Sequence, residues 1–325
     1  MKATAAAPSN IAFIKYWGKK DEKLRLPENG SISMNLSNLT TRTTVEFNSK
    51  FKKDLVVIDD FIDNKESSRV IKQLDLIRKK ANIFHKAKVV SKNNFPKGTG
   101  LSSSASGIAA LTLAASKAAG LNLSEKELSI LARQGSGSAC RSIPDGFVEW
   151  LDGNTSESSY SLSLYPPSYW PIVDIVAVVS KRKKDTSSSD GQKLTSTSPF
   201  FPERLSRIKE KISHLKKFLK NKNFTEFGQM IEEEALELHA IMLTSKPALI
   251  YWLPETVKLM KAVKKWRNDG LEVYFTINTG QDIHLILEEK NIKQLINKLE
   301  KIKEIKNIII NRPSFGARLI DKHLF

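Results

Sequence analysis

Small residues lead directly into an alanine-rich run between residues 95 and 119. Gly98 and Gly100 let backbone amides approach a phosphate without an intervening Cβ atom, and residues 102–104 supply three serine hydroxyls at the expected start of a helix. A helix start offers unpaired N–H donors and partial positive charge, while a serine hydroxyl can bind magnesium. No Gly-Lys-Ser/Thr triplet of a Walker loop is present in this stretch. The pattern predicts a nucleotide-phosphate site. The alternative is an ordinary Gly/Ser loop before a capped helix.

Two cations flank two aromatic rings near the N-terminus, at Lys15, Tyr16, Trp17 and Lys19. Ammonium groups beside rings that carry polar handles can hold a diphosphate through charge and hydrogen bonds. The alternative is an edge strand whose aromatic side chains are core and whose lysines are solvated.

A third segment of small residues, 135–142, contains Arg141. Its guanidinium offers a bidentate fork for a carboxylate or a phosphate, although a tight packing turn with a surface arginine fits the same residues. Cys140 is the only cysteine and has no identifiable partner base, so we expect a buried, unreactive thiol. An intrachain disulfide is impossible, which favours a reducing cytoplasmic setting.

The composition leaves several classes of protein open. At 325 residues the chain can form one large or two medium domains. It contains no apolar run of membrane-spanning length and no secretion signal, and its five histidines lack metal-ligand spacing. The net charge of +17 attracts anions, either nucleic acid or phosphorylated metabolites. However, many lysines, such as those at 209, 211, 216, 217 and 220, are spread along an amphipathic run, which is typical of a solvated helix face.

The elements that must position these segments follow from periodicity and capping. Residues 31–47 alternate as a strand pair would, and Ser124 with Glu127 predicts a capping box. We expect helices over 105–119, 205–219, 257–263 and 292–302, strands over 172–180, 273–277, 283–287 and 308–310, and a loop or helix start over 183–199. Mixed helices and strands indicate an α+β or α/β class with a domain seam near residues 180–200.

Together the three segments resemble the mevalonate diphosphate decarboxylases of the GHMP kinase superfamily. The resemblance covers nearly the whole chain and is most distinctive at residues 10–19 and 135–142. Residues 93–96 with 100–106 resemble the phosphate-binding loop of that family. Shorter matches lie at 146–150, 184–188 and 239–240.

The resemblance implies an α+β GHMP kinase fold. We therefore expect residues 1–185 to form a domain like ribosomal protein S5 domain 2, and residues 186–325 to form a ferredoxin-like domain. It further implies ATP-dependent phosphorylation of the 3-hydroxyl of mevalonate 5-diphosphate, followed by loss of phosphate and CO2 to give isopentenyl diphosphate. ATP and Mg²⁺ are the expected cofactors. A cytoplasmic homodimer without nucleic-acid or membrane partners is the expected form.

The matching positions imply a set of site residues. Those expected to bind substrate are Ala12, Tyr16, Trp17, Lys19, Ser136, Gly137, Ser138, Arg141 and Ser188, with Arg141 on the carboxylate. Those expected to bind ATP are Asn94, Pro96, Gly98, Gly100, Leu101, Ser102, Ser103 and Ser104, with Ser104 also on the metal. Arg141, Lys19, Asn278 and Asp282 occupy the expected catalytic positions.

One motif departs from the family. Its usual Asp-Ala-Gly-Pro-Asn corresponds here to residues 278–282, so Asn278 stands where the family has an aspartate against the 3-hydroxyl. This change favours, as an alternative, a 3-kinase acting on mevalonate or phosphomevalonate without decarboxylation. A second hypothesis is that Asp282 supplies the missing carboxylate, against the reading that it caps a turn. From another class, the charge also fits an RNA-binding protein with an S5-like fold, which would leave the Tyr16, Lys19 and Arg141 set unused.

Overall fold

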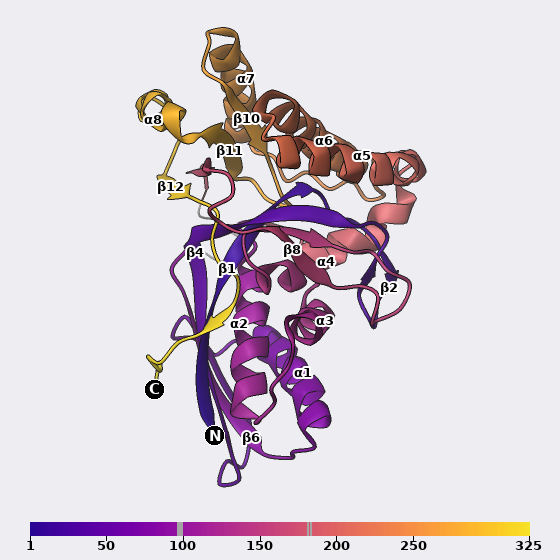
Figure 1. Cartoon of the computed structure of the whole chain (residues 1–325), viewed down its shortest axis with the longest axis vertical. Coiled ribbons are helices and arrows are strands. Elements are labelled where there is room, and N and C mark those ends of the chain that lie inside the picture. Colours follow the sequence, from indigo (N-terminus) through magenta and orange to yellow (C-terminus); the bar gives the residue numbers. More distant parts are fainter. Residues whose placement is uncertain (96–99, 181, 183) are drawn as a thin grey trace.

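The structure is a computed structural model that describes residues 1–95, 100–180, 182 and 184–325. Its described residues form an α+β fold with two main β-sheets and helices packed on both. Figure 1 shows the first sheet with its helices in the lower half of the view, and the second sheet with its helices in the upper half. The expected mixture of helices and strands is therefore confirmed.

The first sheet contains seven of the described strands. Its main path runs β13 (Arg318–Leu319), β1 (Lys2–Ile14), β4 (Ser31–Asn48), β6 (Lys86–Asn93) and β5 (Leu55–Ile58), while β7 (Phe147–Trp150) pairs with β4 and with β8 (Ser161–Tyr165). A short hairpin of β2 (Lys19–Asp21) and β3 (Leu26–Pro27) stands apart from this sheet.

The expectation of a strand pair over residues 31–47 is wrong. The stretch is one long strand, β4, paired with β1 along one edge. Along its other edge, residues 31–34 pair with β7 and residues 41–48 pair with β6. The alternating pattern therefore belongs to one strand that pairs with three others. Alternation with a period of two residues does not by itself indicate where a chain reverses direction.

Three helices pack on one face of the first sheet: α1 (Asn64–Ala81), α2 (Ser103–Ala118) and α3 (Glu125–Gly135). The predicted alanine-rich helix corresponds to α2, whose small side chains are buried against alanines of β1 and against α1. The predicted capping box of Ser124 and Glu127 is present at the start of α3. A 3₁₀ turn, η1 (Gly137–Ser142), follows α3 directly.

The second sheet is antiparallel in the order β10 (Val273–Thr276), β11 (Ile283–Glu288), β9 (Ile172–Val178) and β12 (Asn307–Asn311). Numbered by sequence within this sheet, the order is 2-3-1-4, which is the ferredoxin-like arrangement. Helices α7 (Pro254–Asn268) and α8 (Ile292–Leu299), the latter preceded by η3 (Glu289–Asn291), pack on one face of this sheet.

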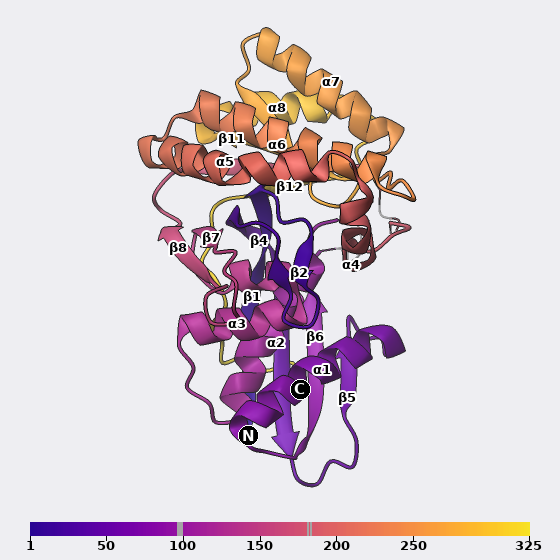
Figure 2. The same cartoon turned by 90° about the vertical axis from the view of Figure 1, so that its right-hand side faces the viewer.

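Helices α5 (Phe201–Asn221) and α6 (Phe224–Thr244) share the opposite face with the ends of β1 and β4. Figure 2 shows these two helices lying across the molecule between the two sheets. The predicted solvated face of α5 is exposed at Lys209, Lys217 and Lys220. Lys211 and Lys216 form ion pairs with acidic side chains, Lys216 with Glu149 of β7.

The sheets do not partition the chain at residue 185. Strand β9 precedes that position yet is a central strand of the second sheet, and β13, near the C-terminus, pairs with β1 in the first. A short helix, α4 (Ser188–Gly191), and the 3₁₀ segment η2 (Gln192–Thr197) fill the stretch expected as a loop or helix start. The domain limits at 185 and 186 stay a proposal.

Candidate active site

The N-terminus of α2 has no side-chain cap among the described residues. Ser102 occupies the N-cap position in the left-handed region, at φ 57°, and makes no capping hydrogen bond. By contrast, α3 has a complete capping box. The first amides of α2 therefore remain available to an anion, and the positive end of the helix dipole favours one.

Neighbouring segments support this helix start. The Ser9 hydroxyl donates to the Leu101 carbonyl at 2.6 Å, and the Ser104 hydroxyl lies 3.4 Å from that of Ser136. Asn94, by contrast, is used by the first sheet: its side-chain oxygen accepts the Thr40 amide of β4. The expected ATP-binding residues Pro96 and Gly98 lie outside the described residues.

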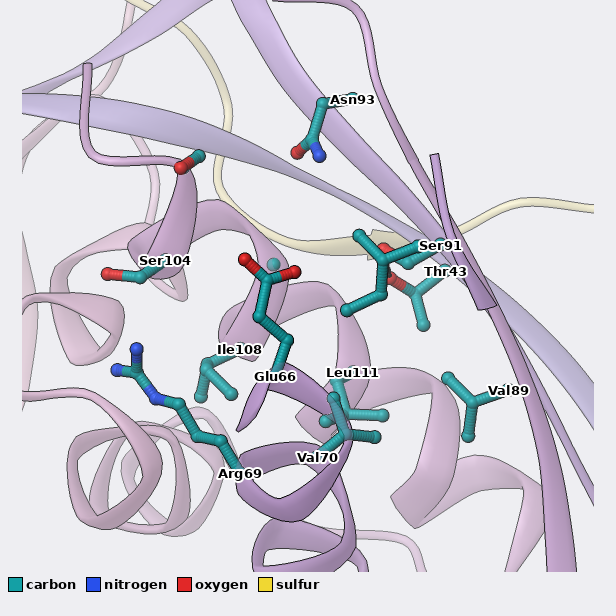
Figure 3. Close-up of a pocket in the computed structure, with 13 residues that line it drawn as sticks. Thr43, Glu66, Arg69, Val70, Val89, Ser91, Asn93, Ser104, Ile108 and Leu111 are labelled. Atoms are coloured by element: carbon teal, nitrogen blue, oxygen red, sulfur yellow. Dashed lines mark hydrogen bonds between the residues drawn. The ribbon is translucent and has the colours of Figure 1, made fainter. Parts of the chain in front are cut away.

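A pocket opens beside Ser103 and Ser104, between α1, α2 and the strands β4 and β6 (Figure 3). Its empty space is about 630 Å³, which includes open solvent at the mouth. Figure 3 shows Glu66 and Arg69 of α1 on one side and Ser91 and Asn93 of β6 on another. Arg69 also donates to the Gly135 carbonyl at the end of α3. We call this cavity the α1–α2 pocket.

Arg141 is buried beneath the end of β1. Its Nε and Nη2 atoms donate to the Asn10 side-chain oxygen at 3.2 and 3.1 Å, and its Nη1 donates to the Ser31 hydroxyl at 2.9 Å. Asn10 in turn donates to the Ser138 carbonyl and the Ser142 hydroxyl, which fixes its orientation. No carboxylate pairs with Arg141 in the described part of the chain, so its positive charge is uncompensated by a direct ion pair.

Tyr16 lies between the Arg141 segment and β7. Its ring packs on Trp150 with centroids 4.6 Å apart, and Gly137 approaches so closely that a Cβ atom there would lie 2.7 Å from the ring. The Tyr16 hydroxyl is buried and has no hydrogen-bond partner among the described residues. Burial raises the pKa of Tyr16, so this hydroxyl is a neutral donor and acceptor.

The two other members of the aromatic cluster differ from Tyr16. Trp17 is fully buried in an apolar cluster with Phe201, Leu249 and Tyr251, as the core alternative for this segment anticipates. The Lys19 side chain is 3% exposed, and its ammonium pairs with Glu22 at 2.7 Å. Lys19 is thus held by a mostly exposed carboxylate, which a stronger anion can displace.

Lys15 joins the end of β1 to the loop after β10. Its buried side-chain nitrogen, Nζ, donates to the Ala12 carbonyl at 2.6 Å and to the Asn278 side-chain oxygen at 3.2 Å. The Asn278 amide group donates to the Ser102 hydroxyl at 3.3 Å, so the expected catalytic position touches the start of α2. Burial lowers the pKa of Lys15 to about 7.

His239 of α6 supports the backbone of the same loop. Its Nε2 lies 3.0 Å from the Asn278 carbonyl oxygen, which can only accept, so Nε2 carries the proton and donates. The ring stacks on Trp252, and burial lowers the pKa of His239 to about 3. It is therefore a neutral structural donor at neutral pH.

Asp282 lies at the far end of the Asn278 loop. Its carboxylate accepts a hydrogen bond at 3.0 Å from the backbone amide of Val179, the residue that follows β9. Ser188, at the start of α4, bonds the Thr279 hydroxyl, and Lys184 donates to both Ser188 and Thr279. Burial lowers the pKa of Lys184 to about 8. The hypothesis that Asp282 replaces the missing carboxylate stays a prediction.

Several of the predicted residues thus form a connected region, whereas the contacts that link them do not join Trp17 and Lys19 to it. Contacts link Ser102 to Asn278, Ser104 to Ser136, Gly137 to Tyr16, and Ser138 through Asn10 to Arg141. Lys15, which the sequence indicates only as one cation of the aromatic cluster, contacts Asn278 here. Further residues of this region were not expected as site residues: Lys184, His239, Glu66, Arg69. Lys15, Lys184 and His239 all lie within segments that resemble the family, and that was the available signal. Glu66 and Arg69 lie in a polar helix with no comparable signature.

Cys140 is buried, as expected. Burial raises its pKa to about 11, and its sulfur contacts the Gly137 carbonyl at 2.9 Å. Within the described residues, no cluster of histidine, cysteine or acidic side chains could hold a metal ion, and no helix is long and apolar enough to cross a membrane.

Comparison with known proteins decides the family. Residues 7–161 match the diphosphomevalonate decarboxylase-like N-terminal domain, and residues 174–314 match the mevalonate 5-diphosphate decarboxylase C-terminal domain. The chain belongs to the diphosphomevalonate decarboxylase family. Its fold is the GHMP kinase fold that the resemblance implied.

Two curated relatives illustrate the range of this decarboxylase family. Diphosphomevalonate decarboxylase of Candida albicans is 34% identical over 317 residues, covering 92% of this chain and 88% of the relative. Phosphomevalonate decarboxylase of Haloferax volcanii is 30% identical and covers 91% of each chain.

Solved structures of the decarboxylase family agree over nearly the whole fold. Mevalonate diphosphate decarboxylase from Staphylococcus aureus is 37% identical, with a TM-score of 0.94 over 98% of each chain. A second structure, described as MDDEF in complex with MVAPP, AMPPCP and magnesium, is 36% identical, with a TM-score of 0.93 over 99% of each chain.

Proposed function

We propose that this chain catalyses the ATP-dependent decarboxylation of mevalonate 5-diphosphate to isopentenyl diphosphate, CO2, ADP and phosphate. The reaction proceeds through phosphorylation of the 3-hydroxyl, which turns a poor leaving group into a good one. One observation carries the proposal: the open start of α2 directly adjoins the Ser136–Arg141 segment through the contact of Ser104 with Ser136. Two polyanions held at these two places would meet at Asn278 and Lys15.

The nucleotide side of the site is formed by α2 and the α1–α2 pocket. The pocket opens beside Ser103 and Ser104, so a nucleoside within it would direct its phosphates towards the start of α2. The uncapped amides there suit phosphate oxygens, and the Ser104 hydroxyl suits a magnesium ion held with them. Magnesium, when bound, neutralises phosphate charge during transfer. The related structure with AMPPCP and magnesium supports this assignment of cofactors.

The substrate side offers partners for both ends of mevalonate 5-diphosphate. The buried Tyr16 hydroxyl lacks a protein partner and can donate to a phosphate oxygen, and Lys19 can exchange Glu22 for the diphosphate. Arg141, whose guanidinium lacks an acidic partner among the described residues, would take the carboxylate. Holding both ends positions the 3-hydroxyl, and positioning is the main protein contribution to phosphoryl transfer.

The neutral Asn278 favours a second candidate function. An amide neither accepts the hydroxyl proton nor repels the substrate carboxylate, so the enzyme would stop after 3-phosphorylation and act as a kinase on mevalonate or phosphomevalonate. The decarboxylase proposal is supported better, because both curated relatives described above are decarboxylases that match over nearly the full chain.

The stoichiometry of ADP and CO2 tests the proposal. Purified enzyme is given ATP, Mg²⁺ and carboxyl-labelled mevalonate 5-diphosphate, and both products are measured over one time course. We expect one CO2 for each ADP. ADP without CO2 would identify the 3-kinase instead.

Substrate specificity is tested in the same assay with mevalonate and its 5-phosphate as competitors. We expect the highest kcat/KM with the 5-diphosphate, because Tyr16 and Lys19 provide contacts for a second phosphate. A preference for the 5-phosphate would assign the chain to the activity named for the Haloferax relative. Absence of ADP release with all three compounds would overturn the proposed function.

A further inference from the structure

Lys15 is a buried lysine at the centre of the proposed active site. Its side chain is buried at the end of β1, where the structure joins the open start of α2 to the loop that carries Asn278. Lys15 is therefore next to the position where the proposed reaction places the 3-hydroxyl. The role inferred for Lys15 rests on that proposed function.

The hydrogen bonds of Lys15 match an uncharged amine. A neutral amine has two N–H donors and one lone pair, whereas an ammonium has three donors and no acceptor. The described residues accept two hydrogen bonds from Nζ, at the Ala12 carbonyl and the Asn278 side-chain oxygen. Both donors of a neutral amine are then used, and the remaining tetrahedral position is its lone pair.

The charges around Lys15 act on its protonation in opposite directions. Glu234 and Asp174 favour the ammonium, while Arg141 and Arg204 oppose it. Glu234 is already engaged by Arg204 and Lys211, which reduces its effect on a third cation. A carboxylate at position 278 would have stabilised the ammonium directly, but this chain has a neutral amide there. Burial is the largest influence, and it lowers the pKa of Lys15 to about 7.

We propose that Lys15, as a neutral amine, accepts the proton of the substrate 3-hydroxyl during phosphoryl transfer. In this step the O–H bond breaks, an N–H bond forms on Nζ, and the hydroxyl oxygen forms a bond to the γ-phosphorus while the bond to ADP breaks. The products are the 3-phosphate, ADP and the Lys15 ammonium, so charge and protons balance. Asn278 is a positioning residue that holds one N–H of Lys15.

A buried ion pair fixes the backbone from which Lys15 extends. Glu234 of α6 accepts the Lys15 amide at 3.0 Å, and Arg204 of α5 donates to the Lys15 carbonyl at 3.0 Å. Arg204 and Glu234 also pair directly with each other, and both side chains are fully buried. The peptide groups on either side of Lys15 are therefore held by the helices between the two sheets.

The pH dependence of turnover in the parent and in Asn278→Asp provides the first test. ADP release is measured at saturating substrates between about pH 5.5 and pH 9.5. The parent should lose activity as pH falls through about 7, because the amine becomes protonated. In Asn278→Asp the new carboxylate takes the proton, so the acid limb should move down by at least about one pH unit. The substrates titrate identically in both proteins, so the variant is a matched control for their own ionisation.

Lys15→Arg provides the second activity test. A guanidinium stays protonated throughout this range, so the variant retains the positive charge but cannot accept a proton. We expect kcat to fall about 100-fold or more, with KM changed by less than about threefold. Retention of more than about a tenth of the parent kcat would overturn the proposal.

The protonation state can also be measured without substrate. In protein labelled with ¹³C-lysine, the Lys15 signal is the one absent from Lys15→Arg, and its side-chain shift should titrate near pH 7. A midpoint above about pH 9 would overturn the proposal.

The outcomes separate the two proposals. If the parent releases no ADP with any mevalonate derivative, the proposed function fails and the role of Lys15 fails with it. If the parent is active but loses activity at the same low pH as Asn278→Asp, only the role of Lys15 is overturned. Asp282→Asn serves as a further comparison: turnover lost in that variant, with Lys15→Arg still active, would assign the proton to Asp282 instead.

Discussion

Neutral hydrogen-bond partners orient Arg141 before substrate binds. We therefore expect its guanidinium to contribute to binding of the substrate carboxylate. Asn10 accepts two of its N–H groups and Ser31 accepts a third, while no described carboxylate neutralises it. The guanidinium can therefore bind a substrate carboxylate without first breaking an ion pair. A lysine at this position keeps the charge but loses the planar fork.

Arg141→Lys should lower kcat/KM for mevalonate 5-diphosphate by about 10- to 100-fold, because a charged hydrogen bond contributes about 1.5–3 kcal/mol. Ser31→Ala, which removes one supporting acceptor, should cost less. Steady-state kinetics measure both variants, and thermal unfolding verifies that they fold. An unchanged kcat/KM in Arg141→Lys would remove this residue from the substrate site.

The lowered pKa of Lys15 also predicts how the stability of the protein depends on pH. A buried lysine that is neutral when folded and protonated when unfolded opposes folding at any pH below its ordinary pKa of 10.5. The unfolded state binds the extra proton, so stability increases with pH between about 7 and 10.5. Below about 7 the folded state is protonated as well, and the dependence ends.

The unfolding free energy of the parent, relative to Lys15→Met, should therefore rise by about 2–3 kcal/mol from about pH 7.5 to pH 9.5. Denaturant titrations at several pH values measure the difference, and all other groups titrate in both proteins. A flat difference would mean that Lys15 keeps its ordinary pKa in the folded protein.

Individual site residues could be predicted where the residue type and its immediate neighbours in the sequence together indicate anion binding. Arg141 and Ser104 stand in short segments of small residues, a pattern that indicates close approach to an anion. The sequence indicates Lys15 only as one of two cations beside aromatic rings. Its contact with Asn278 joins residues 263 positions apart, and period and composition contain no information about such a contact.

At the scale of elements, the start of α2 depends on a close approach between two loops. Gly100 has φ +113°, and a Cβ atom there would lie 2.6 Å from Gly280 of the Asn278 loop. Both the backbone conformation and the contact require glycine.

Gly100→Ala should lower kcat by more than about tenfold, because it displaces the Asn278 loop from the start of α2. Gly270→Ala is the matched control: its φ is also positive, at +91°, but nothing lies within 4 Å of the added Cβ atom. That variant should lose only about 1–2 kcal/mol of stability and keep its turnover. Equal kinetic effects in the two variants would show that backbone strain, not the loop contact, is responsible.

Element prediction succeeded where a strong local signal exists. The alanine-rich run before Gly120 and the Ser124–Glu127 capping box gave α2 and the start of α3. The strand pair expected over 31–47 was wrong, because alternation does not distinguish two short strands from one long strand whose partners change along its length.

At the scale of the whole molecule, the buried pair of Arg204 and Glu234 connects α5 and α6 to β1. Removing Glu234 leaves the buried Arg204 with only the partly exposed Glu237 as a carboxylate partner among the described residues, which is more costly than removing both members of the pair. Glu234→Leu should therefore destabilise the protein by about 3–5 kcal/mol, and Arg204→Met combined with Glu234→Leu should recover part of that loss. Denaturant unfolding measures both. A double variant less stable than Glu234→Leu would contradict this account.

The overall fold class was predictable from the order of elements, but sheet membership was not. Strand β9 lies before residue 185 and pairs with β11 and β12, both of which come more than 100 residues later. Likewise, β13 returns to β1 across almost the full length of the chain. Such pairings are specified by packing between distant segments, which hydrophobic period does not record.

The return of β13 has a consequence for proteolysis. The chain crosses from the first sheet to the second before β9 and crosses back after β12, so residues 312–319 bond again to the first sheet. A protease that nicks the backbone once, between β8 and β9, therefore leaves a C-terminal fragment that still contributes a strand to the first sheet. Only a second nick, between β12 and β13, would produce a second-sheet fragment with no strand in the first.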